Sequence, residues 1–396
     1  MHTLIQLVGQ QAMPNLLAAV VVRPDCLVHL WTRKTRAASE QLRDACKAAG
    51  LDARILFVEL SDMPGIEETR AAVSRAAAEN PGCIVNFTGG TKPMSIGAYA
   101  AAAEKRLPSL YVDTDSGEFR DGATASGFPD LFVERDTSLT TAKSALDVRV
   151  IACANGVPFV DAGKDWRPLA PLAELLLRDD PLEKVCWTAS DDLSKAVEAE
   201  RNWFKQQEVL LRIYGRPVSG FPESVLQTAA ATGLAERHGP NWYWNPALAS
   251  DCEAMRLGMP SREATRALEK AKTPFDFFHG KWWEVAVAAF LDRRGIYRDL
   301  RWNVQTSIRN QNPIEEDLLG VEGANLLYVS CKHGNFNKGL ARTVEEVDAS
   351  ARRLGGSFAR KILAVCTTPG RRQEESLRRR CAQLGIELLF RADLLR

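Results

Sequence analysis

The segment Val85-Asn86-Phe87-Thr88-Gly89-Gly90-Thr91-Lys92-Pro93-Met94 decides the fold of the first part of the chain. It starts in an apolar run, residues 83–87, that is typical of a buried strand, and an alanine-rich helical run, residues 94–103, follows it. The two glycines allow a sharp turn and the close approach of a ligand. A helix that starts directly after such a turn offers unpaired N–H groups and the positive end of its dipole. Together with Lys92, these groups predict an anion site, most simply for a phosphate.

Around this segment, residues 1–150 alternate between strands and helices. We expect strands over residues 3–9, 27–31, 53–60 and 110–113, and helices from 14, over about 37–49 and over about 66–79. After a turn at 115–117, a short hairpin closes the sheet. Strands alternating with helices indicate a parallel sheet covered on both faces, whose ligands bind beyond the carboxyl ends of the strands. The polar residues that fall at those ends are Gly9-Gln10, Thr32-Arg33, Ser61-Asp62 and residues 88–92.

Several classes of protein are disfavoured by the sequence. The segment lacks the Walker A spacing, and no Gly-x-Gly-x-x-Gly follows the first strand, so a P-loop and a nicotinamide dinucleotide site are not expected. The net charge is +1, so no overall basic field points to nucleic acid. The nine cysteines contain no Cys-x-x-Cys pair, which fits a reducing cytosol. Without an apolar run of ~18 residues or a signal peptide, we expect a cytoplasmic protein with no membrane contact.

A middle region, residues 151–265, is expected to be mostly helical, with amphipathic stretches over 171–177 and 194–214. A helix over 224–235 precedes the segment Gly239-Pro240-Asn241-Trp242-Tyr243-Trp244-Asn245. That order is compatible with a winged helix. A helical spacer with an aromatic core is the interpretation that we favour, and the winged helix stays open.

The last unit, residues 266–396, predicts a second, smaller α/β domain. Its helix over 280–291 is apolar nearly all round and contains a single acid, Glu284. The elements expected after it are strands over 296–308, 314–319 and 326–330, a helix over 342–354, a strand over 361–365, a helix over 371–383 and a strand over 386–390.

Three charged residues of this unit predict phosphodiester chemistry. A buried carboxylate such as Glu284 must be paired, protonated or bound to a cation. Asp317 lies on one apolar strand, and Lys332 lies at the end of the next, in the sequence Ser330-Cys331-Lys332. Two acids suit Mg²⁺ or Mn²⁺, which lowers the pKa of a bound water and neutralises the scissile phosphate. The lysine would orient or deprotonate that water.

These motifs resemble two known families. Asp317 followed by Lys332 across two strands, after a helix that bears a glutamate, resembles the PD-(D/E)xK restriction-endonuclease-like fold. The N-terminal residues that resemble a CARF domain, the CRISPR-associated Rossmann-like sensor, are Gly9, Pro14-Asn15 and Asn86-x-Thr88-Gly89-Gly90-Thr91-Lys92-x-Met94. In this order the two units resemble the CRISPR-associated CARF nucleases, over about residues 1–150 and 270–396.

The resemblance implies a homodimer that binds a cyclic oligoadenylate, usually cyclic tetra-adenylate, at the strand ends. The ligand residues implied are Gly9, Gln10, Asn15, Thr32, Arg33, Thr88, Gly89, Gly90, Thr91 and Lys92. Binding would activate the nuclease unit, which would cut DNA or RNA, with single strands favoured, and with little sequence preference. The resemblance also allows slow cleavage of the ligand by the sensor itself.

One position departs from the family pattern, because Ser330 stands where a Glu or Asp is usual. Some relatives of the fold take the missing acid from the next helix, which here contains Glu345, Glu346 and Asp348. The catalytic candidates are therefore Glu284, Asp317, Ser330, Lys332 and Glu346, and the candidate metal ligands are Glu284, Asp317 and Cys331. Weaker metal binding or an inactive nuclease is the other outcome, although we favour activity.

A second function stays open from the sequence. The chain could be a ligand-sensing DNA-binding regulator, with a winged helix in the middle region and an inert last domain. The two hypotheses differ at Asp317 and Lys332, since a regulator would not need them.

Overall fold

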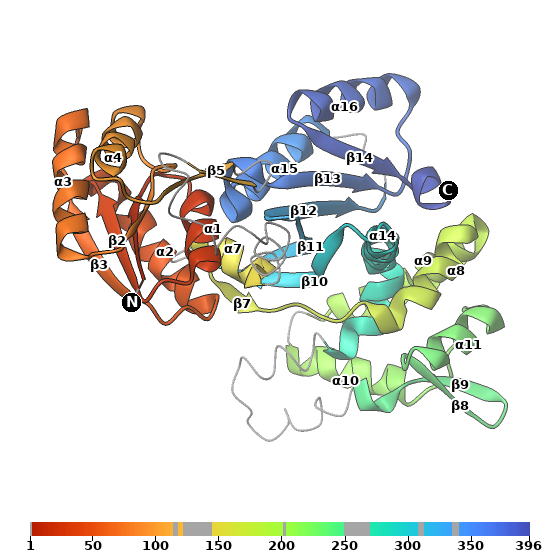
Figure 1. The fold of residues 1–396 in the computed structure, drawn as a ribbon. Coiled ribbons are helices and arrows are strands. Elements are labelled where there is room, and N and C mark those ends of the chain that lie inside the picture. The colour runs from red at the N-terminus through yellow and green to blue at the C-terminus, as the bar shows by residue number, and fades with distance from the viewer. Residues whose placement is uncertain are drawn as a thin grey trace.

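The computed structural model describes residues 2–113, 118–121, 145–200, 203–248, 270–307, 313–334 and 340–396. Within them lie two six-stranded sheets and one two-stranded sheet (Figure 1). The first sheet belongs to the N-terminal unit and the second to the C-terminal unit. The turn predicted at residues 115–117 lies outside the described residues.

The N-terminal sheet has the strand order β3-β2-β1-β4-β5-β6. Its strands are β1 (Thr3–Leu7), β2 (Cys26–Trp31), β3 (Arg54–Glu59), β4 (Ile84–Asn86), β5 (Ser109–Asp113) and β6 (Glu118–Asp121). All neighbours are parallel except β6, which pairs antiparallel with β5. The helices are α1 (Met13–Val22), α2 (Arg36–Ala48), α3 (Ile66–Glu79) and α4 (Lys92–Glu104). Because α1 and α2 share one core and α3 and α4 another, the predicted parallel sheet covered on both faces is confirmed.

A short segment joins this sheet to the rest of the chain. Helix α7 (Val148–Ala154) packs against α1 and α2 on one side and against α15 and strands of the second sheet on the other. Strand β7 (Phe159–Asp161) then pairs antiparallel with β10 at the edge of the second sheet. Figure 1 shows α7 between the two sheets and β7 at the edge of the second sheet.

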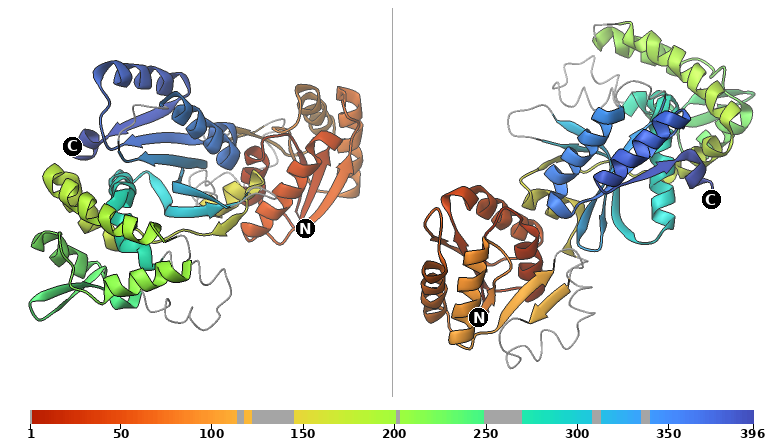
Figure 2. Two further views of the ribbon diagram at one scale, coloured as in Figure 1. Left: turned by 180° about the vertical axis from the view of Figure 1, so that it is seen from behind. Right: turned by 90° about the horizontal axis from the view of Figure 1, so that it is seen from above.

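The middle region is helical, as predicted, and packs on the C-terminal unit. Its elements are η2 (Arg167–Leu169), α8 (Ala170–Arg178), α9 (Asp180–Glu198), α10 (Trp203–Tyr214), α11 (Glu223–Ala231), β8 (Ala235–His238), β9 (Asn241–Trp244) and η3 (Pro246–Leu248). The amphipathic stretch 194–214 is divided between α9 and α10, with residues 201–202 undescribed between them. Trp244 is buried against Phe221, Phe275 and Phe278, so the aromatic residues form a core. Both views of Figure 2 place this region away from the N-terminal sheet.

The C-terminal sheet has the order β14-β13-β12-β11-β10-β7. Its further strands are β10 (Tyr297–Thr306), β11 (Ile314–Glu322), β12 (Asn325–Lys332), β13 (Arg360–Val365) and β14 (Ile386–Phe390). Strands β10, β11 and β12 form an antiparallel meander, and β12, β13 and β14 are parallel. The helices are α14 (Trp282–Arg293), α15 (Leu340–Gly355), α16 (Arg371–Gln383) and α17 (Arg391–Leu394), with a short turn, η6 (Gly356–Phe358), after α15. This mixed α/β unit confirms the predicted fold class.

The helix expected over 280–291 begins differently from the prediction. A π-helical turn, η5 (Phe277–Lys281), precedes α14, and Gly280 within it has a φ of 136°. This conformation is open to glycine and strained for other residues. Lys281, at the end of η5, contacts Glu315 of β11, and Glu284 of α14 contacts Trp302 of β10.

A buried ion pair joins β11 to α15 and so fixes the strand that contains Asp317. Glu316 is 1% exposed, and its carboxylate accepts hydrogen bonds from Arg353 of α15 and from Thr306 Oγ1, the latter at 2.8 Å. A buried carboxylate without its cation is costly, because the charge has lost its water.

Replacing Arg353 is therefore expected to destabilise the fold. We predict that Arg353→Met lowers the free energy of unfolding by about 3–5 kcal/mol, as when one partner of a buried pair is removed. The neighbouring Arg352→Met is the matched control, because Arg352 pairs with Asp348 while 58% exposed, and its loss should change stability by less than about 1 kcal/mol. Urea denaturation measures both, and equal effects would contradict the assignment of a buried pair.

Candidate functional site

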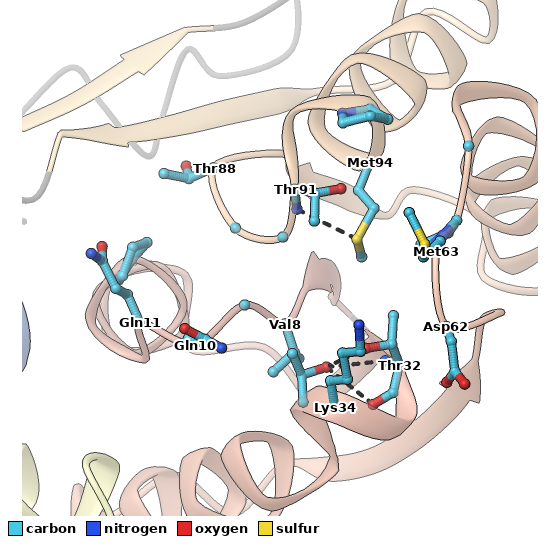
Figure 3. Close-up of a pocket in the computed structure, with 18 residues that line it drawn as sticks. Val8, Gln10, Gln11, Thr32, Lys34, Asp62, Met63, Thr88, Thr91 and Met94 are labelled. Carbon is cyan, nitrogen blue, oxygen red and sulfur yellow. Dashed lines mark hydrogen bonds between the residues drawn. The ribbon is translucent and has the colours of Figure 1, made fainter.

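A pocket of about 840 Å³ lies at the carboxyl ends of the N-terminal strands (Figure 3). Its walls come from the segments after β1, β2, β3 and β4, as expected for parallel strands that end at one edge. The residues that line it are Val8, Gly9, Gln10, Gln11, Pro14, Thr32, Lys34, Thr35, Asp62, Met63, Pro64, Gly65, Thr88, Gly89, Gly90, Thr91, Pro93 and Met94.

The floor of the pocket depends on a close approach of two loops. A Cβ on Gly89 would lie 2.0 Å from the carbonyl oxygen of Leu7, so only glycine fits there. A Cβ on Gly9 would lie 3.0 Å from the amide nitrogen of Gly90. Asn15 is fully buried and its Nδ2 donates to the same Leu7 carbonyl at 2.8 Å. These contacts hold the end of β1 against the turn that follows β4.

Side chains next to the turn fix its backbone. The Thr88 amide donates to Asn86 Oδ1 at 3.1 Å, and Thr88 Oγ1 accepts from the Val112 amide at 2.7 Å. Thr91 is the N-cap residue of α4, and Figure 3 shows its side chain at the pocket beside Met94. Pro93 has no N–H and the Met94 N–H is bound by the Thr91 side chain, so the glycine turn, rather than a row of free α4 amides, forms the fixed edge that suits an anion.

Most predicted ligand residues meet at this pocket. Those that line it are Gly9, Gln10, Thr32, Thr88, Gly89, Gly90 and Thr91. Asn15 lies beneath it, and Lys92, the first residue of α4, is exposed and outside the lining set. The Arg33 side chain pairs with Glu59 at 3.4 Å, whereas its neighbour Lys34 lines the pocket.

The second candidate site lies between α14 and strands β10, β11 and β12. Glu284 Oε2 accepts a hydrogen bond from Trp302 Nε1 at 2.6 Å. Burial, and then the nearby charge of Asp317, raise the pKa of Glu284 to about 8. Burial also raises the pKa of Asp317, an effect that the charge of Lys332 opposes. The predicted trio of Glu284, Asp317 and Lys332 is thus close enough for its members to interact electrostatically.

Ser330 is buried beside Asp317. Asp317 Oδ2 accepts hydrogen bonds from the Cys331 amide at 2.7 Å and from Ser330 Oγ at 3.3 Å. Ser330 therefore orients the aspartate and adds no negative charge. Burial raises the pKa of the Cys331 thiol well above its ordinary value, so a protonated thiol faces this site.

A polar pocket of about 400 Å³ is lined by Lys281 and Glu315, whose charges act on the pKa of Glu284, and neither Glu284 nor Asp317 is in its lining. Lys281 Nζ lies 3.0 Å from Glu315 Oε1 at its wall. Burial opposes the charge of Lys281, yet the carboxylates of Glu284 and Glu315 raise its pKa. The residues that line this pocket are Asp161, Lys164, Asp276, His279, Lys281, Asn303, Gln305 and Glu315. The sequence offered no signal that Lys281 and Glu315 would meet here.

The acids of α15 have other partners. Glu346 forms an exposed ion pair with Arg342 at 2.7 Å, and Asp348 contacts Lys361 and Arg352, both at 2.8 Å. The contribution of Glu346 to the metal site stays a prediction, since the contact found for Glu346 is with Arg342.

Some of the donor atoms near Asp317, the carboxylate oxygens, fit a hard cation, and others do not. Among the described residues, no group of three His, Cys, Asp or Glu side chains is arranged to hold a metal ion. The carboxylates of Glu284 and Asp317 suit Mg²⁺ or Mn²⁺, whereas the sulfur of Cys331 is a soft ligand that suits other metals better. Glu284 and Asp317 are therefore the two side chains that would hold such an ion.

The family comparison concerns the first sheet and its pocket. Residues 3–123 match the family described as the Card1 CARF domain. This part of the chain is a CARF domain. The pocket of about 840 Å³ thus belongs to the CARF domain, and residues 88–91 form its turn. No protein of curated function matches the sequence.

Two solved structures share the fold over almost the whole chain. Can2 from Sulfobacillus thermosulfidooxidans, solved in complex with cyclic tetra-adenylate, is 16% identical with a TM-score of 0.63, and the match covers 98% of this chain and 95% of Can2. Protein VC1899 from Vibrio cholerae is 14% identical with a TM-score of 0.68, over 99% of this chain and 95% of VC1899. At these identities the likeness establishes the arrangement of the elements. No helix in the described parts of the chain is long and apolar enough to span a membrane.

The raised pKa of Glu284 predicts how stability depends on pH. The folded protein binds a proton at Glu284 up to about pH 8, whereas the unfolded chain releases it near the ordinary value of 4.5. The stability that this proton supplies is present below pH 4.5 and is lost as the pH rises through about 8. Glu284→Gln keeps an oxygen for the Trp302 N–H and never ionises.

We therefore predict that Glu284→Gln becomes more stable relative to the natural chain as the pH rises across this window. Urea denaturation in metal-free buffer at several pH values measures the difference. Glu375→Gln, on exposed α16, is the control and should show no such trend. A constant difference for Glu284→Gln would contradict the buried, neutral carboxyl.

Proposed function

We propose that the chain senses a cyclic oligoadenylate in CRISPR antiviral defence and acts as a metal-dependent nuclease. The observation that carries the proposal is the CARF pocket, in which a glycine turn, the Thr91 side chain and Lys34 line one space. This combination suits the phosphates of a cyclic oligonucleotide. Cyclic tetra-adenylate is the ring that we favour, since Can2, which has the same fold, was solved with it.

The sensing unit is proposed to be a homodimer. A ring of repeating nucleotides has rotational symmetry, and a two-fold pair of pockets presents the same groups twice. Met63, which lines the pocket, is 86% exposed. Met63 and the neighbouring exposed Ile66 would be covered in such a pair. The ring would then lie between two copies of residues 88–91.

The chemistry is proposed to take place at Glu284, Asp317 and Lys332. The metal, when bound by the two carboxylates, would supply a water of lowered pKa and neutralise the phosphate. Lys332 would orient that water, and Lys281 offers a second positive charge near the phosphate. Ser330 would orient Asp317 and leave the metal site with fewer charges than the usual motif. The substrate is proposed to be DNA or RNA, with single strands favoured.

The remaining assignments stay predictions. The division into residues 1–150, 151–265 and 266–396 is one of them, and β7 pairs with the C-terminal sheet although it falls in the second range. The cytoplasmic location, the size of the cyclic oligoadenylate ring and slow cleavage of the ligand by the sensor are further predictions.

A DNA-binding regulator is the second candidate function. The observation that favours it is α11 followed by the hairpin β8–β9, which is the helix and wing that such a module needs. The absence, among the described residues, of a group of three ligands around Asp317 also favours a regulator over a metal-dependent nuclease.

Cleavage assays separate the two functions. With Mn²⁺ and cyclic tetra-adenylate we predict cleavage of labelled single-stranded DNA or RNA, and loss of at least about 100-fold in Asp317→Ala and Lys332→Ala, the order found when a charge-stabilising group is removed. Ser330→Glu should lower the Mn²⁺ concentration needed, because it adds a ligand charge. DNA binding that responds to the ligand, without cleavage and unchanged by Asp317→Ala, would instead identify a regulator.

A neighbouring pair of cations tests the sensor pocket. Lys34→Ala should weaken binding of cyclic tetra-adenylate by about tenfold or more, because it removes a charge-assisted contact to phosphate. Arg33→Ala should weaken it by less than about threefold, since the Arg33 side chain is 78% exposed and directed at Glu59. Equilibrium binding of labelled ligand measures the affinity of both variants. A larger loss of affinity in Arg33→Ala than in Lys34→Ala would favour Arg33 as the ligand residue, as expected from the sequence.

A further inference from the structure

The carboxylate of Glu284 is held in place by one tryptophan of β10. Trp302 is 2% exposed, and its indole Nε1 lies 2.6 Å from Glu284 Oε2. An indole nitrogen can only donate, so this hydrogen bond has a single direction. Groups that orient a metal-binding or catalytic side chain in this way strongly affect its function. The placement of Glu284 therefore depends on where β10 holds Trp302.

The backbone of Trp302 is in turn bound by the segment that leaves the CARF domain. The Lys164 amide donates to the Trp302 carbonyl at 2.7 Å. Gly163 packs on the same carbonyl, since a Cβ there would lie 2.5 Å from its oxygen, and its φ is 87°. Just before it, β7 pairs with β10 at Gln305 and Thr306.

The same segment is anchored in the CARF domain by α7. The apolar side chains of α7 share one core with Leu42 of α2 and Leu354 of α15. At the end of α7, Gly156 fits closely against the Gln41 side chain of α2. At its start, the Val148 amide donates to Asp299 Oδ2 at 2.8 Å, three residues before Trp302 in β10. The start of α7 is thus bound to the C-terminal unit, and its end packs against the CARF domain.

A more direct contact between the two units is weaker. Gln11, which lines the CARF pocket, donates to Ser357 Oγ in η6 at 3.4 Å, and both side chains are exposed. Water competes with such a bond, so it contributes little to coupling.

We propose that Trp302 is the positioning residue of Glu284 and that the segment from α7 to Lys164 transmits the ligand state of the CARF pocket to it. This inference rests on the proposed function. A ligand can shift the second site only through an element that both units contact and that differs between the free and bound states. Movement of α2 against α7 would displace Gly163 and Lys164, and with them the Trp302 carbonyl and indole.

Two tryptophan variants test the positioning role. Trp302→Phe keeps an aromatic ring and removes the N–H. We expect kcat for ligand-activated cleavage to fall about 10- to 100-fold, the range found when an orienting partner is lost, with KM and ligand affinity unchanged. Trp242→Phe is the matched control, because it removes the same type of bond, from Trp242 Nε1 to Glu223 Oε2 at 2.8 Å, far from this path. Equal effects of the two variants on kcat would overturn the role of Trp302.

Two glycine variants test whether the segment around Gly163 transmits the ligand state of the CARF pocket to Trp302. Gly163→Ala places a methyl group against the Trp302 carbonyl, whereas Gly295→Ala has a similar φ of 69° and nothing within 4 Å of the added carbon. We expect Gly163→Ala to bind cyclic tetra-adenylate normally and to lose activation, and Gly295→Ala to lose stability alone. Normal activation in Gly163→Ala would overturn the proposal.

Amide hydrogen exchange tests the same path without any cleavage. Cyclic tetra-adenylate should change exchange at Lys164 and across residues 300–306 of the natural chain. If the ligand binds and exchange there is unchanged, the inference fails while ligand sensing stands. If exchange changes but no substrate is cut, the inference stands and the proposed nuclease fails. If the ligand does not bind, both fail.

Discussion

Helix α7 buries its apolar face in a core that both sheets share, and the arrangement of the molecule depends on that packing. Val148, Ile151 and Ala154 contribute to one continuous core with the helices of the CARF domain and with α15 of the C-terminal unit. Separating the units would expose this surface to water, at a cost of ~25 cal/mol per Å². A sensor and a second domain that share a core respond to each other more directly than two domains on a free linker.

The two candidate sites solve opposite electrostatic problems. The CARF pocket offers amides, hydroxyls and Lys34 to a ligand that brings its own negative charge. At the second site the protein supplies the negative charge, and burial keeps Glu284 largely protonated until a cation or high pH compensates. The low number of acids around Asp317 means that a metal would bind through few charges. Whether these few negative charges can hold a metal decides between an active nuclease and an inert protein of the same fold.

The sequence predicted the elements well because their patterns are local. Strand β14 and helix α16 have the predicted bounds, and the glycine turn after β4 was found from two residues. Side-chain direction was harder: Arg33 and Lys34 are adjacent, and only the turn after β2 decides which one faces the pocket. Trp302 gave no signal at all, since its role comes from contacts with segments distant in the sequence. Strand β7 is three residues long and exists only through its pairing with β10.

The central claim is that the CARF pocket forms half of a two-fold site for a cyclic oligoadenylate. Titration calorimetry with cyclic tetra-adenylate in metal-free buffer tests it most directly, because the stoichiometry does not depend on any later chemistry. The account predicts saturation at one ring for two chains. Saturation at one ring per chain, or no binding of the ring at all, would contradict it.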